Sequence, residues 1–189
     1  MNPIAMKGGF TDAPVQSAQN FRALLSALSQ PGTLVEMAGA EPPAPLSPAA
    51  GAAALVLFDG TTPVHLAGRL DTPDLRDWIT FHTGAPLVAA EQAMFALGHW
   101  DDLQPVTRFA IGTPEYPDRA ATLIVEMPDL TPDGATLRGP GIDGEATLSL
   151  PETRAFQMNR ALFPLGFDTY LTAGNRIAGL PRSTLVEAV

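Results

Sequence analysis

The stretch FPLGFDTYLTAGNRIAGLPRST, residues 163–184, decides how the chain is expected to fold. Two runs that favour strands, 167–172 and 176–180, flank the turn signal Ala-Gly-Asn. Glycine and asparagine tolerate the backbone conformations that a tight turn requires. The stretch therefore predicts a terminal β-hairpin.

Three charged residues, Asp168, Arg176 and Arg182, lie among the apolar residues of this stretch. Asp168 falls inside the first predicted strand, with Arg176 across the hairpin, where an ion pair would fix the strand register. A buried charge normally needs a partner, so the pattern fits a structural role as well as a functional site. The residues alone leave both readings open.

Upstream of the hairpin, predicted helices and strands interleave. Apolar periodicity and capping residues indicate helices at 15–30, 49–58, 71–84 and 151–163, and strands at 34–37, 62–68, 93–97, 121–127 and 135–139. Because strands cluster toward the end, where no helix separates them, an all-parallel sheet is excluded. We predict an α/β three-layer fold with a mixed β-sheet, as a single domain over 1–189 with a flexible segment at 1–14.

Two predicted helices carry apolar faces. The first places Ala18, Phe21, Leu25 and Leu28 at helical spacing and ends at Pro31-Gly32. The last makes Phe156, Met158, Leu162 and Phe163 available for burial. Between them, the helix at 71–84 has Thr72 or Asp71 as its N-cap, Pro73 in its first turn and Gly84 at its end.

Composition limits the function classes. The 189 residues are 46% hydrophobic and carry a net charge of −9, which argues against nonspecific nucleic-acid binding. The chain has no cysteine, and its longest apolar stretch, Ala49–Phe58, is too short for a membrane span. We therefore expect a cytoplasmic protein that binds neither nucleic acid nor membrane.

Motifs for chemistry are scarce. His65, His82 and His99 show no metal-ligand spacing, so no metal site is predicted. The run Gly139–Gly144 spells the dinucleotide motif G-x-G-x-x-G, but the residues that follow favour a strand rather than the helix that the motif requires. It is predicted to be a turn, although Arg138 beside its glycines could hold an anion.

Several sequence blocks spread along the chain resemble one family, the PhnH subunit of the bacterial carbon-phosphorus lyase system for phosphonate breakdown. The blocks are NFRALLSALSQPGT (20–33), TPVHL (62–66), ITFHTGAPLV (79–88), ATLIVEM (121–127), LRGPGI (137–142) and LFPLGFDTYLTAGNRIAGLPRST (162–184). They occur in the family's order over nearly the whole chain. The connectors 38–50 and 99–118 carry little resemblance.

The resemblance implies a fold like that of pyridoxal-phosphate-dependent transferases, a homodimer, and partners in the PhnG, PhnI and PhnJ subunits of a core complex. With ATP, that complex forms ribose 1-phosphonate 5-triphosphate from alkylphosphonate. Its iron-sulfur cluster and S-adenosylmethionine belong to another, radical subunit. The resemblance therefore implies a non-catalytic subunit without catalytic residues of its own.

The residues agree with this expectation for cofactors. Pyridoxal phosphate needs a lysine amine for its Schiff base, and the only lysine, Lys7, precedes the first predicted helix. A chain without cysteine offers no thiolate to an iron-sulfur cluster. No cofactor is expected in this chain.

Within this family's motif, we expect Asp168, Arg176 and Arg182 to brace the hairpin or contact a partner, and Phe163–Gly166 to fix the turn that enters it. His82, Thr83 and Arg138 are candidates for a loop site that touches a phosphate-bearing ligand. Two alternatives stay open. One is a stand-alone enzyme for a phosphorylated nucleoside or sugar that uses Asp168, His82 and Arg138, and the other is a small-molecule binding module.

Overall fold

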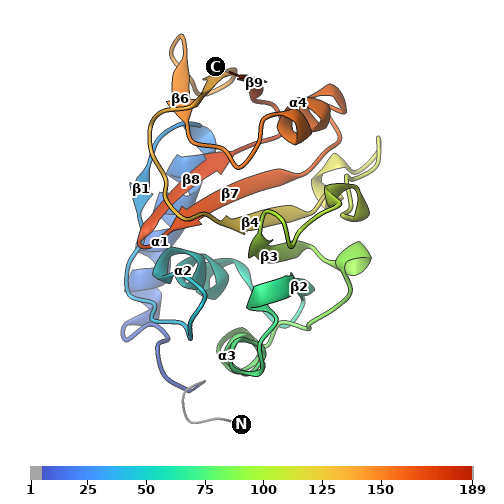
Figure 1. Ribbon diagram of the computed structural model, residues 1–189. Coiled ribbons are helices and arrows are strands. Elements are labelled where there is room, and N and C mark those ends of the chain that lie inside the picture. Colours follow the sequence, from blue (N-terminus) through green and yellow to red (C-terminus); the bar gives the residue numbers. More distant parts are fainter. Residues whose placement is uncertain (1–5, 189) are drawn as a thin grey trace.

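A six-stranded mixed sheet forms the centre of the protein, and Figure 1 shows its strands running across the middle of the molecule. The structure is a computed structural model that describes residues 6–188. The strand order is β1 (Val35–Glu36), β8 (Arg176–Leu180), β7 (Asp168–Ala173), β4 (Thr122–Glu126), β3 (Phe95–His99) and β2 (Val64–Leu66). Strands β2, β3, β4 and β7 are parallel, whereas β8 is antiparallel to both of its neighbours. The predicted hairpin and mixed sheet are confirmed.

A second sheet of three antiparallel strands, which was not predicted, lies near the C-terminus. It consists of β6 (Ala146–Leu148), β5 (Ala135–Arg138) and β9 (Leu185–Glu187). The G-x-G-x-x-G run is the loop between β5 and β6, so the predicted turn is confirmed. Gly141 there has φ +83°, and a Cβ at this position would lie 1.9 Å from the carbonyl oxygen of Ser29. Because residue 141 is a glycine, the loop backbone can pack against the C-terminal end of the first helix.

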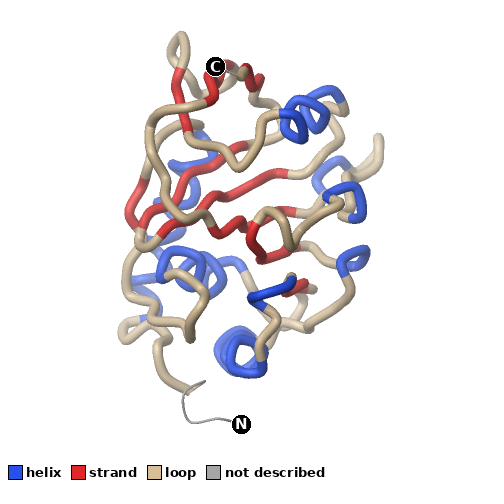
Figure 2. Tube along the Cα trace, viewed as in Figure 1, coloured by secondary structure: helices blue, strands red, loops and turns tan. Residues whose placement is uncertain are grey.

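Within residues 6–188, four α-helices accompany the sheets. Figure 2 shows the helices as blue coils around the red strands. They are α1 (Ala13–Ser29), α2 (Pro48–Leu57), α3 (Pro73–Thr83) and α4 (Arg154–Ala161). Short 3-10 helices cover Gly68–Leu70, Ala90–Gln92, Val106–Arg108 and Pro117–Arg119. The Thr72 side chain accepts a hydrogen bond from the Leu75 amide, and Gly84 ends α3 with φ +71°. Both capping predictions are confirmed.

Hydrophobic residues on the two faces of the large sheet form two separate cores. Ile124 of β4 packs with α1, α2 and α3, where the alanines of α2 permit close contact. Its neighbours Leu123 and Val125 point the other way and pack with Phe156 of α4 and Leu137 of β5. In Figure 1, α3 lies below the sheet, and α4 and the small sheet lie above it. The sheet is therefore a middle layer, as predicted.

The apolar face predicted for α1 is partly wrong. The helix buries Asn20, Leu24 and Ala27, whereas Phe21 and Leu25 are 54% and 58% exposed. Asn20 tolerates burial because its carboxamide donates to the Ala38 carbonyl and accepts from the Ala38 amide. With these hydrogen bonds in place, α1 buries the side that carries Asn20 and not the side that apolar spacing indicates.

The expectation for α4 is also wrong in part. Phe156 is buried, but Met158, Leu162 and Phe163 are 58%, 45% and 51% exposed. Among the described residues, no element covers this side of α4 closely enough to exclude water from them. The helix thus presents an apolar surface to solvent.

The segment before α1 makes specific contacts within the described residues. The Lys7 carbonyl accepts a hydrogen bond from the Trp78 indole N–H at 2.9 Å, and the Gly8 carbonyl accepts from the Glu41 amide at 2.8 Å. Residues 1–5 of the segment predicted to be flexible lie outside the described residues. Across residues 6–188, every helix is too short or too polar to traverse a lipid bilayer.

Candidate functional site

Asp168 and Arg182 form a partly buried ion pair at the first residue of β7. The Asp168 carboxylate accepts from the Arg182 guanidinium at 2.6 and 3.1 Å and from the Arg182 amide at 2.9 Å. The same guanidinium donates to the Pro117 carbonyl at 2.7 Å. The side chains of Asp168 and Arg182 are only 25% and 12% exposed. This pair joins β7, the segment after β8 and the loop before β4.

The ion pair expected between Asp168 and Arg176 does not form. In the hairpin, Arg176 lies opposite Ala173 beside the turn, whereas Asp168 is at the far end of β7. Arg176 instead pairs with Asp129 at 2.7 Å, and both side chains are well exposed. Arg176 is therefore separated from the Asp168 pair by the length of the hairpin.

The turn that leads into β7 is held by Asn159 of α4. Its buried carboxamide donates to the Phe167 carbonyl at 2.8 Å and accepts from the Phe167 amide at 2.9 Å. Gly166 has φ +118°, and a Cβ there would lie 2.5 Å from the Asn159 side-chain oxygen. The geometry of the Phe163–Gly166 turn thus depends on α4 as well as on its own residues.

Arg138 is held by two carboxylates. Its guanidinium donates to both Glu187 oxygens at 2.8 Å and to Glu145 at 2.6 Å. The hydrogen bond with Glu145, followed by the charges of Glu187 and Glu145, raises the pKa of Arg138. These acids compete with any anionic ligand, and the pair with Glu187 joins β5 to β9.

His82 and Thr83 lie at the end of α3 and take part in local contacts. The Thr83 hydroxyl donates to the Ile79 carbonyl at 2.7 Å and accepts from the Ala85 amide at 3.1 Å. The His82 ring lies 5.0 Å from the Trp78 ring, and its Nε2 is 3.2 Å from the Lys7 carbonyl oxygen. The segment before α1 therefore covers part of this ring.

The predicted loop site is not assembled. His82 and Thr83 belong to α3, beside one core, whereas Arg138 belongs to the small sheet beside the other core. In Figure 1 these elements lie at opposite ends of the molecule. Asp168 lies in the central sheet, so the three residues proposed for a stand-alone enzyme are also dispersed. Across residues 6–188, no group of three or more His, Asp or Glu side chains is placed to hold a metal ion.

Glu126, which sequence reasoning did not single out, is a buried acid at the carboxyl end of β4. It lies in register between His99 of β3 and Thr172 of β7, at the edge where ligands of parallel sheets commonly bind. Its carboxylate accepts from the Ser47 amide at 2.7 Å, and Ser47 is the N-cap of α2. The only signal in the sequence is a carboxylate that ends the apolar run ATLIV. Its contacts show that it anchors α2 to the sheet.

Burial raises the pKa of Glu126, although hydrogen bonds from Ser47 and Thr172 and the nearby His99 oppose the shift. A carboxyl group with a raised pKa in the folded state stabilises the fold most below its unfolded pKa, and this contribution is lost as pH rises through the folded pKa. The free energy of unfolding of Glu126→Gln, relative to that of the parent protein, is therefore expected to be higher at pH 7 than at pH 4.5. Urea unfolding at both pH values measures the difference, and a fixed difference would contradict the shift.

The matched variant Glu126→Leu removes the acceptor of the Ser47 amide. Relative to Glu126→Gln, it is expected to lower the free energy of unfolding by about 1–3 kcal/mol at both pH values, because it leaves a partly buried N–H without a partner. Glu126→Gln keeps an oxygen at this position. The comparison separates the hydrogen bond from the charge.

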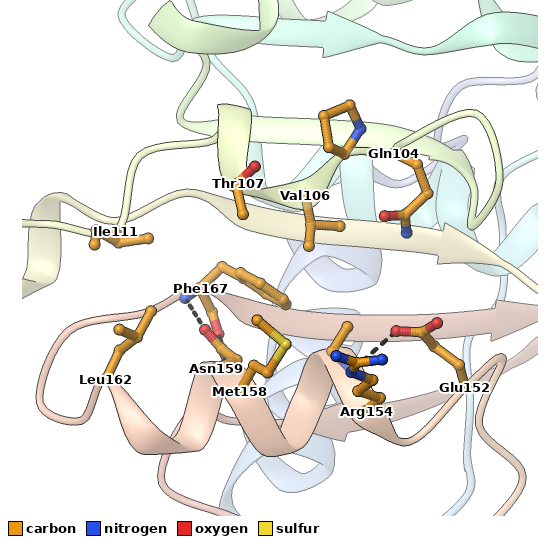
Figure 3. A pocket seen from close by; sticks show the side chains of 12 residues that line it. Gln104, Val106, Thr107, Ile111, Glu152, Arg154, Met158, Asn159, Leu162 and Phe167 are labelled. Carbon is orange, nitrogen blue, oxygen red and sulfur yellow. Dashed lines mark hydrogen bonds between the residues drawn. The ribbon is translucent and has the colours of Figure 1, made fainter.

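An apolar cleft, which none of the predicted ligand-binding residues lines, runs between α4 and residues 104–111 (Figure 3). It encloses about 440 Å³, and Phe167 lies between its walls. Met158 of α4 and Leu162, the C-cap residue of this helix, line it. Both residues fall on one side of the predicted helix, so the sequence does indicate an apolar surface there. Sequence reasoning expects that surface to be buried in the core.

The chain matches the family model described as bacterial phosphonate metabolism protein (PhnH) over residues 8–187. It is 38% identical over 189 residues to a protein of Rhizobium meliloti (strain 1021) named alpha-D-ribose 1-methylphosphonate 5-triphosphate synthase subunit PhnH. That alignment covers 95% of this chain and 94% of the relative.

A second relative is the putative C-P lyase subunit protein HtxG of Stutzerimonas stutzeri. It is 32% identical over 182 residues, which cover 88% of this chain and 84% of the relative. The family model spans both sheets and all four helices, from the segment before α1 to β9. The resemblance found in the sequence blocks is confirmed, and the chain belongs to the PhnH family of bacterial phosphonate metabolism proteins.

Proposed function

We propose that this chain is the PhnH subunit of a carbon-phosphorus lyase core complex and supports ATP-dependent formation of ribose 1-phosphonate 5-triphosphate from alkylphosphonate. The observation that carries the proposal is the family match over residues 8–187. The Rhizobium meliloti relative, similar over nearly its whole length, is named as a synthase subunit. A subunit acts through an assembly, so the proposed role is support of that assembly in the cytoplasm.

The proposed partners are the PhnG, PhnI and PhnJ subunits, and the proposed state of the isolated chain is a homodimer. The role assigned to this chain is non-catalytic. Local bonding supports this assignment, because the Arg138 guanidinium and the Thr83 hydroxyl are both engaged within the chain. Asp168 and Arg182 are engaged with each other.

The proposed fold relationship is to pyridoxal-phosphate-dependent transferases, without their cofactor. The residues of this chain do not fit the cofactor, because its Schiff base requires a lysine amine. Lys7 is the only lysine, and it is an exposed residue of the segment before α1. ATP, S-adenosylmethionine and the iron-sulfur cluster are assigned to the wider system.

Co-expression with the other three subunits tests the proposal. A tag on a companion subunit is expected to retain this chain in a complex of defined mass and composition, determined by native mass spectrometry. The isolated chain is expected to show no turnover of ATP with methylphosphonate. If the other subunits assemble and this chain elutes alone, or if it turns over substrate by itself, the proposed role is wrong.

A further inference from the structure

The cleft beside α4 has one wall made by a helix and one made by a loop. Ala155, Met158 and Leu162 line the helical wall, and Pro105, Val106 and Ile111 line the wall opposite. Figure 3 shows Met158, Leu162 and Phe167 between α4 and the loop. The lining is thus mostly apolar carbon, and it opens to solvent at Met158 and Leu162, which are 58% and 45% exposed.

The exposed apolar surface continues past the cleft. Phe163, which follows the C-cap residue of α4, is 51% exposed, with the Arg160 guanidinium 5.0 Å from its ring centroid. Single exposed apolar residues are ordinary, but a contiguous group beside an apolar hollow marks a binding surface. The central contacts of protein interfaces have this character.

Charge around the cleft is unusual for this acidic protein. Within residues 6–188, Arg154 in the lining, Arg108 beside the loop wall and Arg160 on α4 have no carboxylate partner. The Nε atoms of Arg108 and Arg160 are also buried without a hydrogen-bond partner. Glu152 is the acid in the lining, and its carboxylate accepts from the Ala155 amide at 2.8 Å. The cleft therefore combines an apolar lining with three nearby arginines that form no ion pair within the described residues and one acid, Glu152.

The lining offers few free polar groups to a small molecule. The Asn159 carboxamide is occupied by the Phe167 backbone, and the Glu152 carboxylate caps α4. Small-molecule sites usually fix their ligand with several placed polar groups. A twofold pairing of the cleft with itself would place the arginines of both copies in one interface, where like charges repel. A protein partner of different sequence fits better.

We propose that this cleft docks an apolar segment of a companion subunit, with acidic residues beside that segment facing Arg154 and Arg108. The inference rests on the proposed role in an assembly and names the surface that serves it. Apolar side chains of the partner fill the hollow and cover Met158 and Leu162. Carboxylates at its edges pair with the arginines and fix the orientation of the segment.

Retention on a tagged companion subunit, in the co-expression experiment described above, tests the cleft. Met158→Asp is expected to reduce the retained chain by roughly tenfold or more, because it places a charge where apolar side chains dock. Met94→Asp is the control, since Met94 is similarly exposed at 51% and does not line the cleft. It is expected to leave retention unchanged.

The charge is tested separately with Arg154→Glu, which is expected to reduce retention severalfold more than Arg22→Glu. Arg22 is an exposed arginine of α1 that also lacks an ion pair within the described residues. Thermal unfolding of each variant establishes that it folds. Because all four substituted side chains are exposed, melting temperatures close to that of the parent protein are expected.

The outcomes separate the two proposals. Failure of the parent chain to join the complex overturns the assembly role and, with it, this inference. Retention of folded Met158→Asp at the parent level overturns the cleft proposal alone. If Met158→Asp converts an isolated dimer into a monomer and leaves retention intact, the cleft binds a second copy of this chain. If the parent protein binds ATP saturably and Arg154→Glu abolishes that binding, the cleft binds a small molecule. Either result overturns the proposal.

Discussion

Gly179→Ala is expected to lower the free energy of unfolding by roughly 3 kcal/mol or more, because it forces overpacking against backbone. Gly179 lies in β8 directly beneath α1. A Cβ at this position would be 2.5 Å from the Ala27 carbonyl oxygen and 2.7 Å from the Leu28 Cα. These atoms belong to the helix backbone, so no side-chain rotation can make room for the methyl group. The helix would have to move off the sheet.

The displacement has consequences for other contacts of α1. The Tyr170 hydroxyl of β7 donates to the Leu24 carbonyl at 3.3 Å, and Leu24 is part of the core beneath the helix. The Ser29 carbonyl lies against Gly141 in the small sheet's loop. A shift of α1 therefore loosens contacts with both sheets, which is why the expected loss exceeds that of an ordinary added methyl group.

Gly60→Ala is the matched control. Its Cβ would meet no atom closer than 3.8 Å, and its φ is not in the left-handed region. The substitution is expected to change stability by no more than about 0.5 kcal/mol, or to raise it slightly because alanine restricts the unfolded chain. Denaturant unfolding monitored by circular dichroism compares the two variants. Equal stability of the two would show that α1 is not pressed against β8.

The parts of the fold that sequence predicted correctly depend on neighbours along the chain. Helix α3 begins where the Thr72 oxygen accepts the Leu75 amide and ends at left-handed Gly84, and both signals lie within one turn of the helix end. The hairpin of β7 and β8 is similarly specified by its Gly174-Asn175 turn, where Gly174 has φ +57°. Local chemistry of this kind is visible without knowledge of the tertiary fold.

The small sheet escaped prediction because one of its two pairings, between β5 and β9, is distant in sequence. Strand β9 is only three residues long. It pairs with β5, although β6, α4, β7 and β8 separate the two strands in the sequence. A segment this short shows no usable periodicity. Its place in a sheet follows from the approach of the C-terminal segment to β5, which only the tertiary structure reveals.

Apolar residues on α1 and α4 could not be assigned to core or surface from spacing alone. Asn20 takes a buried position on α1 because Ala38 satisfies its carboxamide, and the sequence does not reveal that distant partner. On α4, Met158 and Leu162 occupy helical positions that a core would also use. A helix surface that binds another protein shows the same spacing of apolar residues as a helix surface that packs in the core of its own chain.

The partner expected for Asp168 was wrong for a related reason. Two arginines, Arg176 and Arg182, follow Asp168 at distances that a hairpin can bring close, and sequence reasoning chose the one across the strands. The register decides otherwise, because Thr169 lies opposite Leu180 and Ala173 opposite Arg176. The chain that leaves β8 then carries Arg182 back to Asp168.

Arg182→Ala is expected to lower the free energy of unfolding by about 2–3 kcal/mol, which is less than for a fully buried pair because Asp168 is 25% exposed. The substitution removes the guanidinium that donates to Asp168 and to the Pro117 carbonyl. Of the described donors to the Asp168 carboxylate, the Arg182 amide alone then remains. The partly buried Asp168 carboxylate is then left without a positively charged partner within residues 6–188.

Arg176→Ala is the control, because its pair with Asp129 is exposed to water on both sides. Exposed ion pairs contribute little, so a loss of about 0.5 kcal/mol or less is expected. Arg182→Lys should fall between the two, since it keeps a charge but cannot donate to Asp168 and Pro117 as a planar fork. Urea unfolding of the three variants orders them, and similar losses for Arg176→Ala and Arg182→Ala would contradict a special contribution of the Asp168 pair.

A double-mutant cycle with Asp168→Ala then isolates the interaction. Because the two side chains bond to each other, the double variant is expected to lose less stability than the sum of the single variants. Retention of folded Arg182→Ala in the complex separates the bracing role from a partner contact. Since its side chain is only 12% exposed, the guanidinium has little surface to offer another subunit, and retention should follow the fraction of folded protein. A loss of retention beyond that fraction would instead place Arg182 at the interface.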